Sequence, residues 1–461
     1  MAKRGHARRS ARAPSARAVA RPPSPAVVRI PFADGVTVIG LVFVVVGTSL
    51  FVDPGAYASF EAPKRLVALA GAAVCAFAAF GLGRGAFGWV RAWREIPLPA
   101  RVALAAFSFA LLWCGIAAVA SPFRSASLDT FRTILLYALF VPLGATRAAA
   151  RGKGLLVGSL LAATAANAAL SLAQSRGHSP FKLQTFGTRN ETGALAGNVG
   201  YLALALAIGA VLALGLGLSA RSRPVRAAAV AALLLFLTGL VVNRNLTALV
   251  SLAAGGVVLL AVRFGRRSIL AMVAVVAALA AAAAFSAPLR HRIAETAGMV
   301  RAGDWDRLTT YRTGAWVAAL DMARERPLLG WGPGTYAAEF VPHRLQAEIR
   351  ARRRYVNPLL TSSYSEAHCD YLQAFAETGL PGGLAAIAAF AALVAGLARR
   401  TADPATSRAE RAILLGILAA GAAAALTWFP MQRPISATPL LLAAGRSWRI
   451  AAARREEAFP P

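Results

Sequence analysis

Acidic residues and cysteines are scarce in this 461-residue sequence. It contains 20 Asp and Glu against 50 Lys and Arg, and only three cysteines. Cys75, Cys114 and Cys369 show neither metal nor redox spacing, so they indicate no zinc site and no disulfide framework. A Walker loop is missing too, because the stretch GWGPGT at 330–335 lacks the Lys that such a loop requires. We interpret that stretch as a tight turn that closes a helix.

The strict alternation of apolar and polar residues that a transmembrane barrel needs is also absent. Instead, 57% of the residues are hydrophobic, 15% are charged, and the mean hydropathy is +0.56. The apolar residues form runs of roughly 17 to 25, the length with which a helix crosses a hydrocarbon core of about 30 Å. Since backbone in lipid must satisfy its own hydrogen bonds, these runs predict an all-α integral membrane protein. We predict about twelve transmembrane helices, at 35–51, 66–82, 102–119, 128–144, 154–173, 194–216, 225–242, 246–262, 269–285, 382–397, 412–429 and 434–449.

The net charge of +30 follows this predicted topology. With both termini in the cytoplasm, 29 Lys and Arg fall in the inner loops and tails, and nine fall in the short outer loops. The positive-inside rule predicts this asymmetry. The basic excess therefore indicates orientation and contact with anionic membrane lipids rather than nucleic-acid binding.

The predicted domains follow from the same pattern. Residues 1–30 carry many Arg, Ala and Pro and no acid, which is typical of a disordered basic cytoplasmic tail. Helices one to nine form an N-terminal bundle over 31–288, and helices ten to twelve occupy 382–450. Between them, 289–381 forms one large periplasmic loop with short helices, and a connection of this length in a compact protein is usually functional. One of these helices is expected in TYRTGAWVAALDMARERP, which has a helical apolar stripe and stops at Pro327.

The end of this loop gathers several functional groups in SEAHCDYLQAFAETGLPGG at 365–383. On a helix, His368, Tyr371, Leu372 and Phe375 would share one face, and the glycines and proline of GLPG would break that helix before span ten. His is the side chain whose ordinary pKa suits proton transfer near neutral pH, although a lone His more often packs or caps.

Four blocks of the sequence carry a resemblance to a known family. His-Cys followed by nine residues and Gly-x-x-Gly, at 368–382, resembles the signature of the O-antigen ligase and Wzy-type polymerase superfamily, in which Asn, Ser or Gln stands where this chain has Cys369. RTGAWVAALDMARERPLLGWGPG at 312–334, FGTRNETGALAGNVGYLALAL at 186–206 and NRNLTALVSLAAG at 243–255 are similar to further family segments. The resemblance covers roughly residues 185–440.

The resemblance implies an inner-membrane glycosyltransferase that needs no metal or other cofactor and inverts the sugar carbon. Its donor would be a glycan on undecaprenyl pyrophosphate, and the acceptor hydroxyl would belong to lipid A-core, a growing glycan or a protein. Arg189, Arg244 and Arg312 would bind the pyrophosphate, since a guanidinium fork grips phosphate oxygens in pairs. His368 would be the base, with Arg312 and Arg244 stabilising the developing charge at the periplasmic face. Two acidic residues of the same segment give possible support, namely Asp370 and Glu377.

A polytopic transporter or flippase of lipid-linked glycans is the alternative. Twelve spans with both ends inside suit a carrier, but a carrier of two six-span halves would place its long loop in the centre of the sequence, on the cytoplasmic side. Here the long loop follows the ninth predicted span.

Overall fold

The computed structural model of the chain describes an all-helical protein. The described residues contain no strand. They are 32–56, 58–82, 93–179, 191–265, 267–268, 270, 287–355, 364–399 and 408–453.

The described helices follow one another along the chain in the order below. The α-helices are α1 (Phe32–Leu50), α2 (Glu61–Ala76), α4 (Leu98–Ala120), α5 (Arg124–Ala138), α6 (Phe140–Gly144), α7 (Arg147–Arg151), α8 (Lys153–Gln174), α9 (Val199–Ser219), α10 (Arg223–Asn243), α11 (Leu246–Phe264), α13 (Ala287–Arg301), α14 (Trp305–Leu308), α15 (Thr313–Glu325), α16 (Tyr336–Ala351), α17 (Asp370–Ala398), α18 (Arg408–Ala425) and α19 (Pro434–Ala452). The shorter turns are η1 (Phe77–Leu82), η2 (Trp93–Glu95), η4 (Ala194–Ala196) and η5 (Pro430–Gln432).

Nine helices of the described residues are long and apolar enough to cross a membrane. They match predicted spans one to eight and span ten, so the all-α membrane class is confirmed. The predicted span at 269–285 lies outside the described residues, apart from position 270. The last two predicted spans are the helices α18 and α19, but neither is among the nine. The 18 residues of α18 include three charged ones, Arg408, Glu410 and Arg411.

The centre of the bundle is α9, in which 14 of 21 residues are buried. Small residues let its neighbours approach closely, as is usual where transmembrane helices pack. A Cβ placed on Gly255 of α11 would lie 2.7 Å from the carbonyl oxygen of Gly416 in α18. A Cβ on Gly445 of α19 would overlap the carbonyl oxygen of Val141 in α6. The last helix is therefore fitted into the bundle by its glycine.

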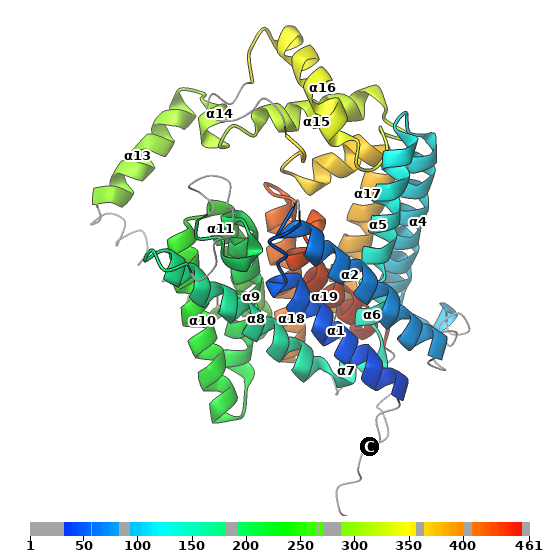
Figure 1. Cartoon of the computed structure of the whole chain (residues 1–461), viewed down its shortest axis with the longest axis vertical. Helices are drawn as coiled ribbons and strands as arrows, with labels where there is room; N and C mark the ends of the chain where they lie inside the picture. Colours follow the sequence, from blue (N-terminus) through cyan, green and yellow to red (C-terminus); the bar gives the residue numbers. More distant parts are fainter. Residues whose placement is uncertain are drawn as a thin grey trace, which may run out of the picture.

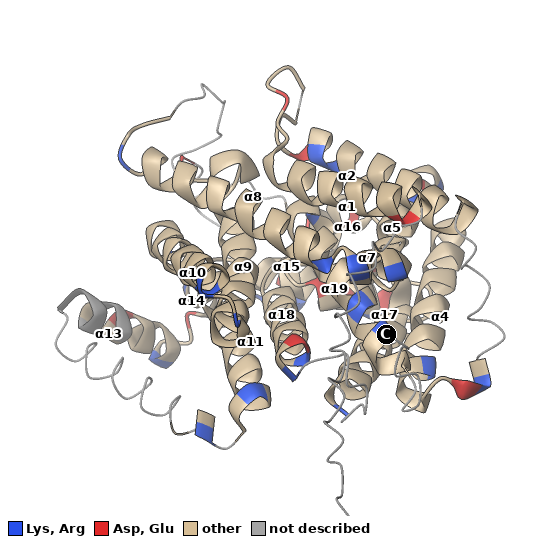
Figure 2. Ribbon diagram, turned by 90° about the horizontal axis from the view of Figure 1, so that it is seen from below, with Lys and Arg blue, Asp and Glu red and all other residues tan. Residues whose placement is uncertain are grey.

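The helices α13 to α16 lie together at one end of the bundle (Figure 1). Helix α15 is the helix expected before Pro327, and it packs on the start of α17. Seen from below, Lys and Arg gather around α7 and the nearby ends of α18 and α19 (Figure 2). There Arg151 pairs with Asp34 at 2.7 Å, and Glu410 binds both Lys153 at 3.0 Å and Arg446 at 2.7 Å.

Candidate active site

His368 lies outside the helix that the sequence predicted for it. Helix α17 begins at Asp370, Cys369 is its N-cap, and His368 has a left-handed backbone with φ of 52°. The prediction that His368 shares a helical face with Tyr371 is therefore wrong. The physical reason is the extended backbone of Cys369 (φ −161°, ψ 106°), which turns the chain just before the helix starts. The carbonyl oxygen of His368 accepts a hydrogen bond from the Trp316 indole at 3.4 Å.

Cys369 stands where the superfamily signature has Asn, Ser or Gln. It is buried and makes no side-chain cap hydrogen bond, whereas Asn and Ser are among the preferred N-cap residues. Burial raises the pKa of the Cys369 thiol, so the side chain is a neutral thiol at physiological pH. The position is therefore a helix cap in this fold, and cysteine is a weak choice for it.

The Gly-x-x-Gly block produces the break that the sequence predicted. Gly379 has φ of 66° and ψ of −175°, and it divides α17 into two helical parts. A Cβ at Gly379 would overlap the carbonyl oxygen of Leu328, and Leu380 donates its N–H to the carbonyl oxygen of Pro327 at 2.7 Å. Trp113 of α4 then joins both segments, because its indole lies 3.1 Å from the carbonyl oxygens of Leu328 and Thr378.

The turn at 330–335 packs on the same part of α17. Gly330, Gly332 and Gly334 all have positive φ, so the chain turns tightly here, between the end of α15 at Glu325 and the start of α16 at Tyr336 rather than directly at a helix end. Trp331 and Gly332 donate their N–H groups to the carbonyl oxygens of Ala376 and Glu377, at 3.0 and 2.8 Å. Two of the sequence blocks that carry the resemblance thus form one structural unit beside His368.

Aromatic rings surround the imidazole of His368. The ring centroids of Tyr364, Trp428 and Phe429 lie 5.2, 5.2 and 4.9 Å from it, all in edge-on geometry. Nδ1 of His368 is buried and has no hydrogen-bond partner among the described residues. A buried nitrogen without a partner costs free energy, and a catalytic role is one reason for which such a nitrogen is kept.

The rings of Tyr364, Trp428 and Phe429 together form an aromatic box around His368, and two arginines flank it. Arg312, at the N-cap of α15, donates Nη1 to the carbonyl oxygen of Thr427 at 3.0 Å and lies 5.0 Å over the Trp428 ring. Arg433 lies 4.8 Å over the Phe429 ring. Burial, followed by the charges of Arg312 and Arg433, lowers the pKa of His368 to about 3. The imidazole is therefore neutral at physiological pH.

The predicted phosphate-binding arginines have different outcomes. Arg312 lies beside the box, as described above. Arg244 is exposed, with φ of 49°, at the tight turn from α10 to α11. Thr247, three residues later, shares a hydrogen bond of 3.1 Å with the hydroxyl of Thr427, so the turn lies near the segment that holds Arg312. Arg189 lies outside the described residues.

Asp370 and Glu377 hold neighbouring segments in place. The carboxylate of Asp370 accepts hydrogen bonds from the Met431 N–H at 3.0 Å and the Gln432 amide at 3.3 Å. Glu377 is buried and accepts from the Gln373 amide at 3.0 Å and the Tyr336 N–H at 3.3 Å. Asp370 thus holds the connection between α18 and α19, which carries Trp428 and Phe429. Glu377 holds the turn at 330–335.

Sequence reasoning missed the connection between α18 and α19, which supplies Trp428, Phe429 and Arg433. We expected span eleven to run to 429, but α18 ends at Ala425. Pro430 disfavours helical conformation at Phe429, and in a continued helix its ring would clash with the carbonyl group of Leu426, four residues earlier. The available signal was WFPMQRP at 428–434, in which two aromatic residues and an arginine surround a proline.

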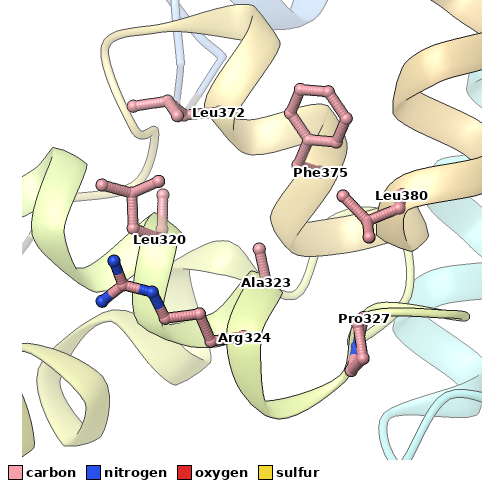
Figure 3. Close-up of a pocket in the computed structure, with 8 residues that line it drawn as sticks. Leu320, Ala323, Arg324, Pro327, Leu372, Phe375 and Leu380 are labelled. Carbon is pink, nitrogen blue, oxygen red and sulfur yellow. The ribbon is translucent and has the colours of Figure 1, made fainter.

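A pocket of about 500 Å³ opens between α15 and the first part of α17 (Figure 3). Leu372, Phe375 and Leu380 line one wall, and Leu320 and Arg324 lie on the other. The predicted grouping of Leu372 with Phe375 is therefore seen in this pocket rather than beside His368.

Comparison with known proteins supports the resemblance drawn from the sequence. Residues 231–387 match a protein-family model described as O-antigen ligase. This range includes Arg244, Arg312 and the His368 block. No curated protein matches the chain. Residues 231–387 are therefore similar to an O-antigen ligase domain, which supports the O-antigen ligase and Wzy-type polymerase superfamily named from the sequence.

Proposed function

We propose that this protein transfers a glycan from an undecaprenyl-pyrophosphate donor to an acceptor hydroxyl. The observation that carries the proposal is the neutral His368, with its unpartnered Nδ1, beside Arg312. The reaction takes place at the end of the bundle covered by α13 to α16, which is the periplasmic face if the basic end in Figure 2 is cytoplasmic. Both termini are then in the cytoplasm of a bacterial inner-membrane protein, and 289–381 is a periplasmic segment.

The proposed chemistry is a single in-line displacement. The acceptor oxygen attacks the anomeric carbon and forms the new glycosidic bond while its proton passes to the imidazole of His368. The bond from that carbon to the pyrophosphate oxygen breaks, and the oxygen keeps both electrons. The sugar carbon is inverted, and Arg312 and Arg244 stabilise the charge that develops on the leaving group. No metal is needed for these steps.

Two arginines also affect the imidazole. Arg312 and Arg433 disfavour the imidazolium form of His368. A bound pyrophosphate brings negative charge that offsets theirs, which raises the pKa of His368 toward its ordinary value. Donor binding therefore makes the imidazole a stronger base at the stage when a proton has to be accepted.

The test is glycan transfer in detergent, with the purified protein, an undecaprenyl-pyrophosphate-linked glycan and candidate acceptors, without nucleotide. Wild-type protein should form product with an inverted linkage, and His368→Ala should lose at least about 100-fold in rate, as expected for removal of a general base. His178→Ala is the matched control, because His178 is exposed at the end of the α8 segment. No transfer with any donor, combined with movement of the lipid-linked glycan across vesicles, would instead establish the transporter alternative.

A further inference from the structure

Arg433 lies beside the aromatic box, and the transfer chemistry described above does not require it to bind the donor. Its side chain is 12% exposed. It pairs with Glu61 at 3.4 Å and, through Nη2, with the carboxylate of Glu366. A buried guanidinium is stable only when it is paired in this way, so both of its terminal nitrogens are committed to protein carboxylates.

The faces of the same guanidinium are also covered. It lies 4.6 Å over the Tyr201 ring and 4.8 Å over the Phe429 ring. Phe429 is stacked on Trp428 with centroids 4.7 Å apart and an interplanar angle of 15°. Because Trp428 and Phe429 both contact His368, a continuous line of packing runs from Arg433 to the imidazole.

The local sequence sets the backbone position of Arg433. It is the N-cap of α19, with extended backbone (φ −115°, ψ 124°), as expected before Pro434. Its carbonyl oxygen accepts the N–H of Ala437 at 2.8 Å. Its partner Glu61 is the first residue of α2, which lies before residues 185–440, the part of the chain that carries the family resemblance.

We propose that Arg433 is a positioning residue for His368. Held by Glu61 and Glu366, it fixes the Trp428–Phe429 pair against the imidazole and so connects the N-terminal helices to the candidate site. This role rests on the proposed transfer reaction. It predicts that losing Arg433 lowers the rate of the chemical step more than it weakens donor binding.

Kinetics of three variants separate positioning from binding. Arg433→Met removes the charge and keeps much of the apolar stem, so kcat should fall at least about tenfold while KM for the donor changes less than about threefold. Arg433→Lys should restore part of kcat, because an ammonium keeps the charge but cannot pair and stack as a planar fork does. Phe429→Leu keeps both ion pairs and removes the ring, and it should lower kcat in the same way. Arg132→Met is the control, since Arg132 is an exposed, ion-paired arginine on α5.

A second readout needs no donor. Diethyl pyrocarbonate modifies accessible neutral imidazoles, and mass spectrometry can assign the label to each of the five histidines. The labelling rate of His368 should rise several-fold in Arg433→Met and in Phe429→Leu. The rate at His343, which is 1% exposed, should stay unchanged and serves as the internal folding control.

The outcomes are distinct. Absence of transfer by the wild type would refute the proposed function, and the labelling of His368 would still test the positioning role. If the wild type is active and His368→Ala is inactive, unchanged kcat and labelling in Arg433→Met would overturn that role. A rise in KM with kcat intact would also overturn it, because Arg433 would then bind the donor. If Arg433→Met does not fold, Phe429→Leu and Glu61→Gln decide by the same two measurements.

Discussion

Gly379 is the residue whose replacement should damage the site most through the backbone alone. Its φ of 66° and ψ of −175° lie in a region that only glycine occupies readily. Holding an alanine there costs about 1–3 kcal/mol. The added methyl group would also overlap the carbonyl group of Leu328, and it would lie 2.8 Å from the carbonyl oxygen of Pro327. Since the obstacle is backbone, overpacking adds about 1–3 kcal/mol more.

The expected loss for Gly379→Ala is therefore about 2–6 kcal/mol, unless the 327–334 segment moves away. Such a movement would weaken the hydrogen bond from the Leu380 N–H to the carbonyl oxygen of Pro327 and those from the Trp113 indole. The turn at 330–335 would then no longer pack against α17. Either response should lower transfer activity. Stability can be measured by thermal or denaturant unfolding in detergent, and activity by the transfer assay.

Gly256→Ala is the matched control for this experiment. Gly256 lies within α11, and a Cβ there would meet nothing within 4 Å. Because alanine favours a helix over glycine by about 0.8–1.0 kcal/mol, this variant should be as stable as the wild type or more stable. A Gly379→Ala protein that unfolds like the wild type and keeps full activity would refute the idea that the kink depends on glycine.

Three further predictions address the site itself. Arg312→Lys should lower kcat/KM at least about tenfold with little change in unfolding, because an ammonium cannot reproduce the planar fork; wild-type kinetics would show that charge alone suffices. Cys369→Ser should raise the free energy of unfolding by about 0.5–1 kcal/mol and leave kcat unchanged, because serine caps α17; lower stability would show that position 369 does not act as a cap. Folded His368 has a pKa of about 3 against an ordinary 6.5, so it binds fewer protons than the unfolded chain between these values. Its contribution to stability is thus complete above pH 6.5 and is lost as the pH falls toward 3, and His368→Gln should flatten that part of the curve of unfolding free energy against pH.

The helices were predictable because an apolar run is a local property of the sequence. Within the described residues, the match to nine helices that are long and apolar enough to cross a membrane follows from run length, and α15 followed from its apolar stripe. The break at Gly379 was equally local, since Gly and Pro fix the backbone of their own neighbourhood. The start of α17 was not predictable in this way. His368 fits a helical pattern with Tyr371 and Leu372, and only the structure shows that the helix begins two residues later.

The surroundings of His368 could not be predicted from local pattern, because they join distant parts of the chain. Trp428 follows His368 by 60 positions, and Glu61 precedes Arg433 by 372. In the sequence, nothing distinguishes Arg433 from the other basic residues of the short loops. In the structure, Arg433 is buried between two carboxylates and two rings. These contacts distinguish it from other basic residues, and they form only when the bundle packs.

The same reasoning explains why the N-terminal helices matter to a site whose recognisable blocks lie after residue 185. Glu61 binds Arg433 from the start of α2, and Lys64, one turn later, donates to the carbonyl oxygen of Leu195 in η4. Lys64 is 1% exposed, and a charge buried to this extent is kept only where its hydrogen bonds are made. Helix α2 therefore holds both the α18–α19 connection and the segment before α9. The first helices thus do more than anchor the chain in the membrane, because they fix the position of the groups that surround His368.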